Sequence, residues 1–231
     1  MLRHLRAHSR LLLNRSVRHT SYCFDARPLE LSAVGQPSRV LFGAEVAATQ
    51  LGALSRASGM RKVLLVRDRD AAATSRARFM EFLLLQAGVP SFQYTLERDC
   101  ASLNGVDHAA AMAQRVGADS VVAFGGGNTM DMARAVAVIM ANGGRAADFV
   151  AAATEESEQE ELMLQQRKLE TAPLLLVPTI AGSGAEVATS TMLLEEDSEM
   201  KVLFAAGRAI VPEVILVFDM ATSVTCVKLT R

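Results

Sequence analysis

The sequence predicts an α/β fold: a Rossmann-like parallel sheet with helices on both faces, and a small β-rich lobe beside it. Short apolar runs such as KVLLV, SVVAF and LLLV have the length of strands and lack the polar alternation of a half-exposed sheet. Helical patterns separate these runs, as in sheets built from strand–helix–strand units. Half of the 231 residues are apolar and about a fifth are charged, which is the balance of an ordinary globular protein.

Strands and helices alternate along the first 180 residues. Gly88, with Pro90 beyond it, marks the end of the second helix, and Gly117 marks the end of the third. The expected strands are 40–42, 62–66, 92–96, 120–124 and 174–177, and the expected helices are 45–58, 71–87, 104–116 and 128–141.

The pattern changes after Pro178. Three further strands are expected at 188–194, 202–205 and 214–218, with a turn at 196–199 between the first two. We expect these strands to form the β-rich lobe beside the parallel sheet.

Residues 154–170 differ from their surroundings, because they contain six glutamates and neither glycine nor proline. Ser157 and Glu160 have the spacing of a capping box for a short charged helix. The segment is either a solvated surface insertion, which the charge pattern favours, or an acidic patch that binds a partner.

Residues 1–24 predict an organellar transit peptide, because they hold five arginines, several hydroxyl residues and no acid. A disordered basic tail is the alternative.

Without the five arginines the formal net charge falls from −1 to −6, so the remaining chain has no general attraction to nucleic acids or anionic membranes. No apolar run approaches the roughly 18 residues that a membrane span needs, so we expect no transmembrane helix.

The cysteines and histidines argue against a metal centre built by this chain alone. The three cysteines contain no CxxC pair, which indicates a reducing compartment and no cysteine zinc site. Three of the four histidines lie within the first twenty residues, which leaves His108 on a predicted helix. We expect His108 to be a surface residue and not a metal ligand.

The first glycine-rich turn follows the buried run SVVAF and consists of Gly125, Gly126 and Gly127, with Asn128 opening the next helix. Glycines accept positive φ angles and leave room for a ligand against the backbone. The helix start offers unpaired N–H groups and the positive end of a dipole, which suit a pyrophosphate. Asn128 is a suitable N-cap. A structural turn with no ligand is the alternative, since the motif is neither GxGxxG nor a P-loop.

A second turn follows the run LLLV and reads PTIAGSGAE, with hydroxyls at Thr179 and Ser183. Both turns follow strands of one parallel sheet, so they should lie at its carboxyl edge, where open α/β sheets bind ligands. Asp68 follows the earlier strand KVLLV, and an acid there can bind the adenosine ribose of NAD and repel the extra phosphate of NADP. Each feature also has a purely structural interpretation: a tight turn, or a capping or solvent-facing aspartate.

The paired motifs GGGNTMD and PTIAGSGAE resemble those of the iron-containing, group III alcohol dehydrogenase family, over roughly residues 38–219. The motif GGGxTMD and the transit-like start are most similar to its mitochondrial hydroxyacid-oxoacid transhydrogenase branch, which implies that the transit peptide is mitochondrial. Asn128, Ile180 and Ala185 depart from the residues usual in the family's motifs, and Arg134 replaces a usual lysine.

The resemblance implies a metal-dependent oxidoreductase that exchanges hydride between NAD(P) and a small alcohol or hydroxyacid, and Asp68 favours NAD over NADP. It implies Fe²⁺ or Zn²⁺ in a C-terminal helical domain, and it allows a homo-oligomer. The cofactor-binding residues that it implies are Asp68, Gly125, Gly126, Gly127, Asn128, Asp131, Thr179, Ser183, Ser190, Met192 and Lys201.

The family's metal ligands, one aspartate and three histidines, lie beyond the position that Asp219 matches. We therefore expect a transit peptide (1–24), a dinucleotide-binding domain (25–219) and a divergent tail (220–231), without the metal-binding domain. Three interpretations stay open at this point. The chain is the cofactor half of an NAD-linked enzyme, a truncated non-catalytic nucleotide-binding relative, or a fragment with no function of its own.

Overall fold

The computed structural model describes residues 39–43, 45–69, 75–98, 100–150, 169–180, 183–188, 190–206, 212 and 214–218. The predicted transit peptide (1–24), nearly all of the acidic segment (154–170) and the divergent tail (220–231) therefore lie outside the described residues.

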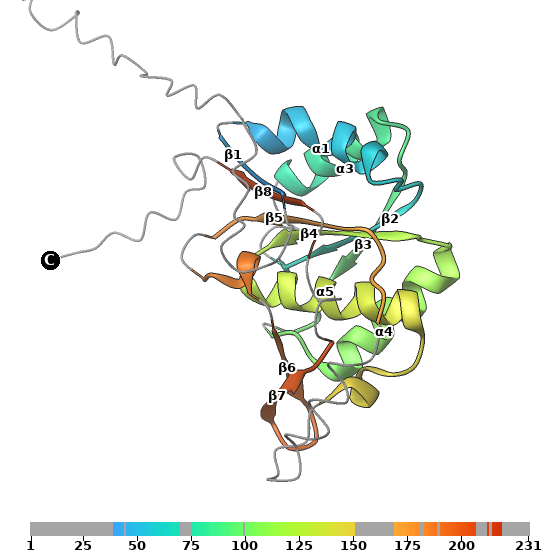
Figure 1. The fold of residues 1–231 in the computed structure, drawn as a ribbon, viewed down its shortest axis with the longest axis vertical. Helices are drawn as coiled ribbons and strands as arrows, with labels where there is room; N and C mark the ends of the chain where they lie inside the picture. The colour runs from blue at the N-terminus through green and yellow to red at the C-terminus, as the bar shows by residue number, and fades with distance from the viewer. Residues whose placement is uncertain are drawn as a thin grey trace, which may run out of the picture.

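A six-stranded sheet forms the centre of the fold, and every neighbouring pair of strands in it is parallel (Figure 1). This confirms the predicted Rossmann-like sheet. The spatial order is β1-β8-β5-β4-β2-β3. The strands are β1 (Arg39–Gly43), β2 (Val63–Arg67), β3 (Ser91–Thr95), β4 (Ser120–Gly125), β5 (Leu174–Pro178) and β8 (Val214–Phe218).

The order of the strands creates a crevice between β2 and β4. From β2 the chain continues to β3 on one side, whereas from β4 it continues to β5 on the other side. Ligands of open parallel sheets bind at such a switch point, beyond the carboxyl ends of the strands. A ligand site is therefore expected among the residues that follow β2, β4 and β5.

Helices cover both faces of the sheet, as the sequence predicts (Figure 1). Successive residues of a strand point to opposite faces. Leu64 therefore packs in the cluster under α4 and α5, and Leu65 packs in the cluster under α1 and α3. The helices are α1 (Val46–Ala57), α3 (Ser75–Gln86), α4 (Leu103–Val116) and α5 (Gly127–Asn142), with short 3₁₀ turns η2 (Ala146–Phe149) and η3 (Ala185–Val187).

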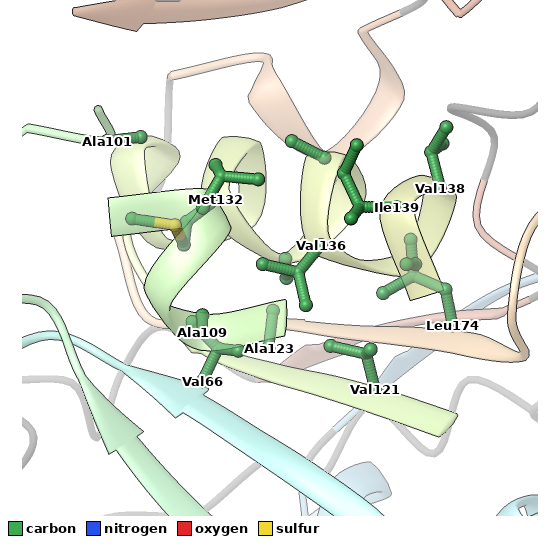
Figure 2. Close-up of a cluster of buried hydrophobic side chains, with 14 of the residues drawn as sticks. Val66, Ala101, Ala109, Val121, Ala123, Met132, Val136, Val138, Ile139 and Leu174 are labelled. Carbon is green, nitrogen blue, oxygen red and sulfur yellow. The ribbon is translucent and has the colours of Figure 1, made fainter. Parts of the chain in front are cut away.

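The larger core lies between the sheet and α5, the most deeply buried of the described helices (Figure 2). Val121 and Ala123 of β4 face Met132 and Val136 of α5 within this cluster. Ala109 of α4 adds a small side chain that lets the two helices approach the sheet together. The core thus fixes the start of α5 relative to the end of β4, which is where the first glycine turn lies.

The β-rich lobe is smaller than expected. The strands β6 (Thr191–Glu195) and β7 (Met200–Phe204) form an antiparallel hairpin, and its turn occupies 196–199 as predicted. The third expected strand, β8, is not part of the lobe: it lies in the main sheet between β1 and β5. Its sequence VILVF has no polar alternation, which is typical of a parallel strand covered on both faces.

Candidate functional site

The first glycine turn joins β4 directly to α5. The expected positive φ is wrong here, because none of the glycines of this turn adopts one. The requirement is for space: a Cβ at Gly125 would lie 2.7 Å from Thr129 Cβ and 2.8 Å from Asp68 Oδ2. A Cβ at Gly126 would lie 3.1 Å from Ile180 Cδ1. Glycine is therefore needed at Gly125 because two other segments press against its backbone.

The first backbone amides of α5 lie outside the hydrogen-bond ladder of the helix. The N-cap is Gly126 and not Asn128, which lies exposed in the first turn of the helix. The first hydrogen bond of the helix runs from Met130 N to Gly126 O at 3.1 Å, so the amides between these two residues have no partner within the helix. These amides and the helix dipole create a positive region that suits a phosphate.

Thr129 is a site residue that the sequence interpretation missed. Its side chain is buried, and its Oγ1 has no hydrogen-bond partner. A buried hydroxyl without a partner costs stability, so a bound ligand that accepts or donates a hydrogen bond there would stabilise it. The sequence held a signal for it, because Thr129 lies two residues after the last glycine of the turn in GGGNT.

Asp68 joins the end of β2 to the glycine turn. Its Oδ2 accepts a hydrogen bond from Gly126 N at 3.3 Å. Together with the start of α5 it borders a pocket of about 300 Å³ beyond the carboxyl ends of β2 and β4. The pocket is lined by Asp68, Arg69, Leu96, Arg98, Gly126, Gly127, Asn128, Thr129 and Ile180.

The second turn lies against the first. Thr179 N donates to Gly125 O at 2.9 Å, directly after β5 ends. Ser183 and Ala185 lie beside Gly127, where an added Cβ would meet Ala185 Cβ at 3.4 Å. Gly182 lies outside the described residues, but the residues around it bring the two turns together as the sequence predicts.

Ser183 and Gly184 shape the local conformation of the second turn. The hydroxyl of Ser183 donates to Glu186 Oε2 and accepts from Ala185 N, both at 3.3 Å. Gly184 has a φ of 66°, in the left-handed region, and here glycine is required for conformation. The hydroxyl of Ser183 is exposed and does not line the pocket.

Arg134 connects the two turns through a buried guanidinium, a role that local sequence patterns do not predict. Its Nη2 donates to the carbonyl oxygens of Ala185 and, at 3.0 Å, of Glu186. Its Nη1 donates to Asp131 Oδ1 at 3.4 Å. The side chain is fully buried, and burial lowers the pKa of Arg134. One residue of α5 therefore holds η3 in place beside the glycine turn.

Asp131 belongs to this buried pair and does not line the pocket. Burial raises the pKa of Asp131 to about 6, although the charges of Arg134 and Lys201 act in the opposite direction. The carboxylate is thus a partner of Arg134 in the structure, placed one helical turn below the residues that border the pocket.

We expect stability to fall as the pH rises from about 4 to about 6. In that window folded Asp131 retains a proton that the unfolded chain has released, so rising pH favours unfolding by about 1–3 kcal/mol. Urea unfolding at several pH values tests this on the wild type and on Asp131→Asn, whose profile should lack this decline. Equal slopes in the two proteins would show that Asp131 does not titrate in this window.

The structure does not bring Ser190, Met192 and Lys201 to the pocket. Ser190 is exposed just before β6. The register of the hairpin pairs Met192 with Leu203 and Leu194 with Lys201, which places Met192 and Lys201 on one face of it. Both side chains are exposed. The charge of Lys201 nevertheless acts to lower the pKa of Asp131, so this side chain lies near the Asp131–Arg134 pair.

His108 lies on the surface of α4, with Nδ1 at 3.1 Å from Glu97 Oε1.

Within the described residues, no three His, Cys, Asp or Glu side chains come together in a way that could hold a metal ion. The helices of that same part of the chain include none that is long and apolar enough to cross a membrane.

A family model described as iron-containing alcohol dehydrogenase matches residues 37–219. Among curated proteins, the chain is 30% identical over 139 residues to a 4-hydroxybutyrate dehydrogenase of Cupriavidus necator, a match that covers 60% of this chain and 34% of that protein. It is 25% identical to an alcohol dehydrogenase 4 of Schizosaccharomyces pombe, a match that covers 80% of this chain and 40% of that protein.

Solved structures share the fold. A sulfoacetaldehyde reductase from Bifidobacterium kashiwanohense, in complex with NAD⁺, superposes with a TM-score of 0.67 at 22% identity, over 79% of this chain and 45% of that one. An archaeal alcohol dehydrogenase from a Red Sea brine pool gives a TM-score of 0.69 at 21% identity, over 79% of this chain and 44% of that one. The chain thus spans less than half the length of each of these relatives.

Proposed function

This chain belongs to the iron-containing alcohol dehydrogenase family, and from that premise we propose that its cleft binds NAD for hydride exchange with a small alcohol or hydroxyacid. The observation that supports this most strongly is the pocket at the switch point. It combines the start of a helix, with the positive end of its dipole, a buried hydroxyl without a partner at Thr129, and the carboxylate of Asp68.

The groups at the pocket match the polar parts of a dinucleotide. The amides at the start of α5 and the hydroxyl of Thr129 would bind the pyrophosphate. Asp68 would bind the hydroxyls of the adenosine ribose, since its carboxylate can accept from the diol while it accepts from Gly126 N. Ile180, which is exposed beside Gly126, would form the apolar wall opposite. When bound, the nicotinamide supplies the group that accepts or donates hydride.

The second turn would then define the far wall of the cleft. Thr179 is tied to Gly125, and η3 is tied to Arg134, so both turns keep a fixed spacing. A fixed cleft pays little ordering entropy when the ligand binds. The described residues offer no ligand set for iron or zinc, so we assign no step of the reaction to a metal within this part of the chain.

Isothermal titration of the full chain with NAD⁺ tests the proposal, and Asp68→Ala is the informative variant. We expect the variant to bind NAD⁺ about tenfold or more weakly, because it loses a charged acceptor for the ribose and its bond to Gly126 N. Asp197→Ala, at an exposed position of the hairpin turn, is the matched control and should bind like the wild type. Absence of binding by the wild type would overturn the proposal.

Turnover distinguishes an enzyme from a binding module. If this chain is an enzyme, it should reduce NAD⁺ with a small alcohol or hydroxyacid. The variant Asp68→Ala should then lose that activity. Binding of NAD⁺ without turnover across a panel of such substrates, with iron or zinc supplied, would instead support the non-catalytic alternative for this chain.

We also propose that residues 1–24 direct the chain to mitochondria, on the composition described above. A fluorescent fusion should localise to mitochondria, and a variant with Arg3, Arg6, Arg10, Arg15 and Arg18 replaced by glutamine should not. Mitochondrial localisation of that variant would contradict the proposal.

A further inference from the structure

The strand β3 forms an open edge of the main sheet. Among the strands that the structure describes, it pairs with β2 alone. Leu96 N, directly after the strand, donates to Arg67 O at 2.9 Å, so the even-numbered residues of β3 direct their backbone groups toward β2. Because these groups alternate in direction along a strand, the N–H and C=O groups of Ser91, Gln93 and Thr95 point away from the sheet.

This edge lacks the features that usually prevent a free strand from pairing. Its sequence SFQYT contains neither a charged residue nor a proline. Lys62 lies close by, with Nζ at 5.7 Å from the ring centre of Phe92. Its ammonium donates to Val116 O at 3.0 Å, however, which holds it against the end of α4. The outward backbone groups of β3 are therefore available to a further strand.

Helix α3 contacts β3 and exposes an apolar stripe beside this edge. Phe79, Phe82 and Leu85 follow one another at three-residue spacing and are 43%, 52% and 64% exposed. Phe92, on the strand itself, is 38% exposed. Together these side chains leave about 400 Å² of apolar surface uncovered, if a large side chain offers about 200 Å². A patch of this size on an isolated chain marks an interaction surface.

We propose that two copies of this chain associate through β3 and α3 about a two-fold axis. Antiparallel pairing that is centred on Gln93 would place Ser91 opposite Thr95 of the second copy. Each outward N–H and C=O group of these three residues would then have a partner across the axis. This inference does not depend on dinucleotide binding, since it uses the side edge of the sheet and not the pocket.

A second copy fits this surface because the surface is complementary to itself. A strand edge offers donors and acceptors in equal number, and the same axis turns the stripe of α3 toward its own copy. The exposed apolar side chains supply about half of the roughly 800 Å² per partner that a stable interface buries. The strand backbone and its polar neighbours supply the rest. Pairing of this kind uses both free β3 edges, so it stops at two copies.

Sedimentation of the full chain tests the proposal. We expect a species of twice 24.8 kDa, with a dissociation constant of about 10 μM or lower. The variant Gln93→Pro loses one outward N–H and keeps the bonds to β2, and Phe82→Lys places a charge in the stripe. Each variant should weaken association about tenfold or more. Met200→Lys, at an exposed apolar residue of the β6–β7 hairpin, is the matched control and should associate like the wild type.

Residue-resolved amide exchange of the wild type tests the pairing itself. The amides of Ser91, Gln93 and Thr95 should gain protection as the protein concentration rises. Those of Phe92 and Tyr94 should be protected at every concentration, because they face β2. Association through α3 alone would leave the first three amides unprotected and would overturn the strand pairing.

Three other results would also overturn the proposal. One is a wild type that stays monomeric at about 100 μM, ten times the expected dissociation constant. Another is a dimer that folded Phe82→Lys leaves unchanged, since its interface would lie elsewhere. The third is a series of larger oligomers, which a closed two-fold pairing does not form. Circular dichroism of each variant verifies its fold, and Phe82→Lys decides the outcome if Gln93→Pro does not fold.

Discussion

Replacement of Arg134 by methionine is expected to destabilise the protein by about 3–5 kcal/mol, because it leaves the largely buried carboxylate of Asp131 without its hydrogen-bond partner. It also removes the two bonds to the carbonyl oxygens of Ala185 and Glu186. Methionine has a similar length and no polar group, so the effect reports the lost interactions more than lost volume. Urea unfolding monitored by circular dichroism measures the change.

Two further variants make this result specific. Arg78→Met, at an exposed position on α3, should change the stability by no more than about 0.5 kcal/mol. The double variant Asp131→Asn/Arg134→Met should be more stable than Arg134→Met alone, because no uncompensated carboxylate remains. A single variant as stable as the wild type would show that the guanidinium does not hold η3 to α5.

Replacement of Gly125 by alanine has the second large expected effect. Its Cβ would lie 2.7 Å from Thr129 Cβ and 2.8 Å from Asp68 Oδ2, so β4, the start of α5 or the end of β2 must shift. Overpacking of this kind costs about 1–3 kcal/mol. The affinity for NAD⁺ should fall about tenfold or more, because the displaced groups are those proposed to bind it.

Gly127→Ala is the matched comparison for stability. Its Cβ would make an ordinary contact at 3.4 Å with Ala185 Cβ, so the free energy of unfolding should stay within about 0.5 kcal/mol of the wild type. If Gly125→Ala were as stable as Gly127→Ala and bound NAD⁺ normally, the tight packing of β2, β4 and α5 at this turn would not be needed for the site.

Local sequence patterns predicted most of the sheet, because buried parallel strands need continuous apolar runs and these runs stand out. The strand SVVAF, the following glycines and the helix after them are present within one residue of their predicted positions. The hairpin turn at 196–199 was also predicted from local residues. Such features depend on residues that are close together in the sequence, so the sequence alone is enough to predict them.

Local patterns could not predict which strands pair when they lie far apart in the sequence. The run VILVF was correctly predicted as a strand, but its place between β1 and β5 depends on partners far away in the chain. The same holds for Arg134, since a charged residue in a helical pattern is usually assigned to the solvated face. Its burial follows from the carbonyl groups of η3, which only the folded chain brings to α5.

The candidate site was predicted in part. The glycine turn and Asp68 meet at one pocket, and Thr179 connects the second turn to the first. Thr129, Arg69 and Arg98, which line the same pocket, were missed, because their positions depend on burial and on the adjacency of β2 and β3. Asn128 lines the pocket but does not cap the helix, a distinction that the backbone geometry of the turn decides.

Amide hydrogen exchange of the full chain, with and without saturating NAD⁺, tests the central proposal most directly. We expect added protection to concentrate in three segments that converge at the pocket: the end of β2 through Arg69, the turn from β4 into α5, and the end of β5 through Ile180. Protection confined to other segments, or no protection at saturation, would contradict a dinucleotide cleft at this edge of the sheet.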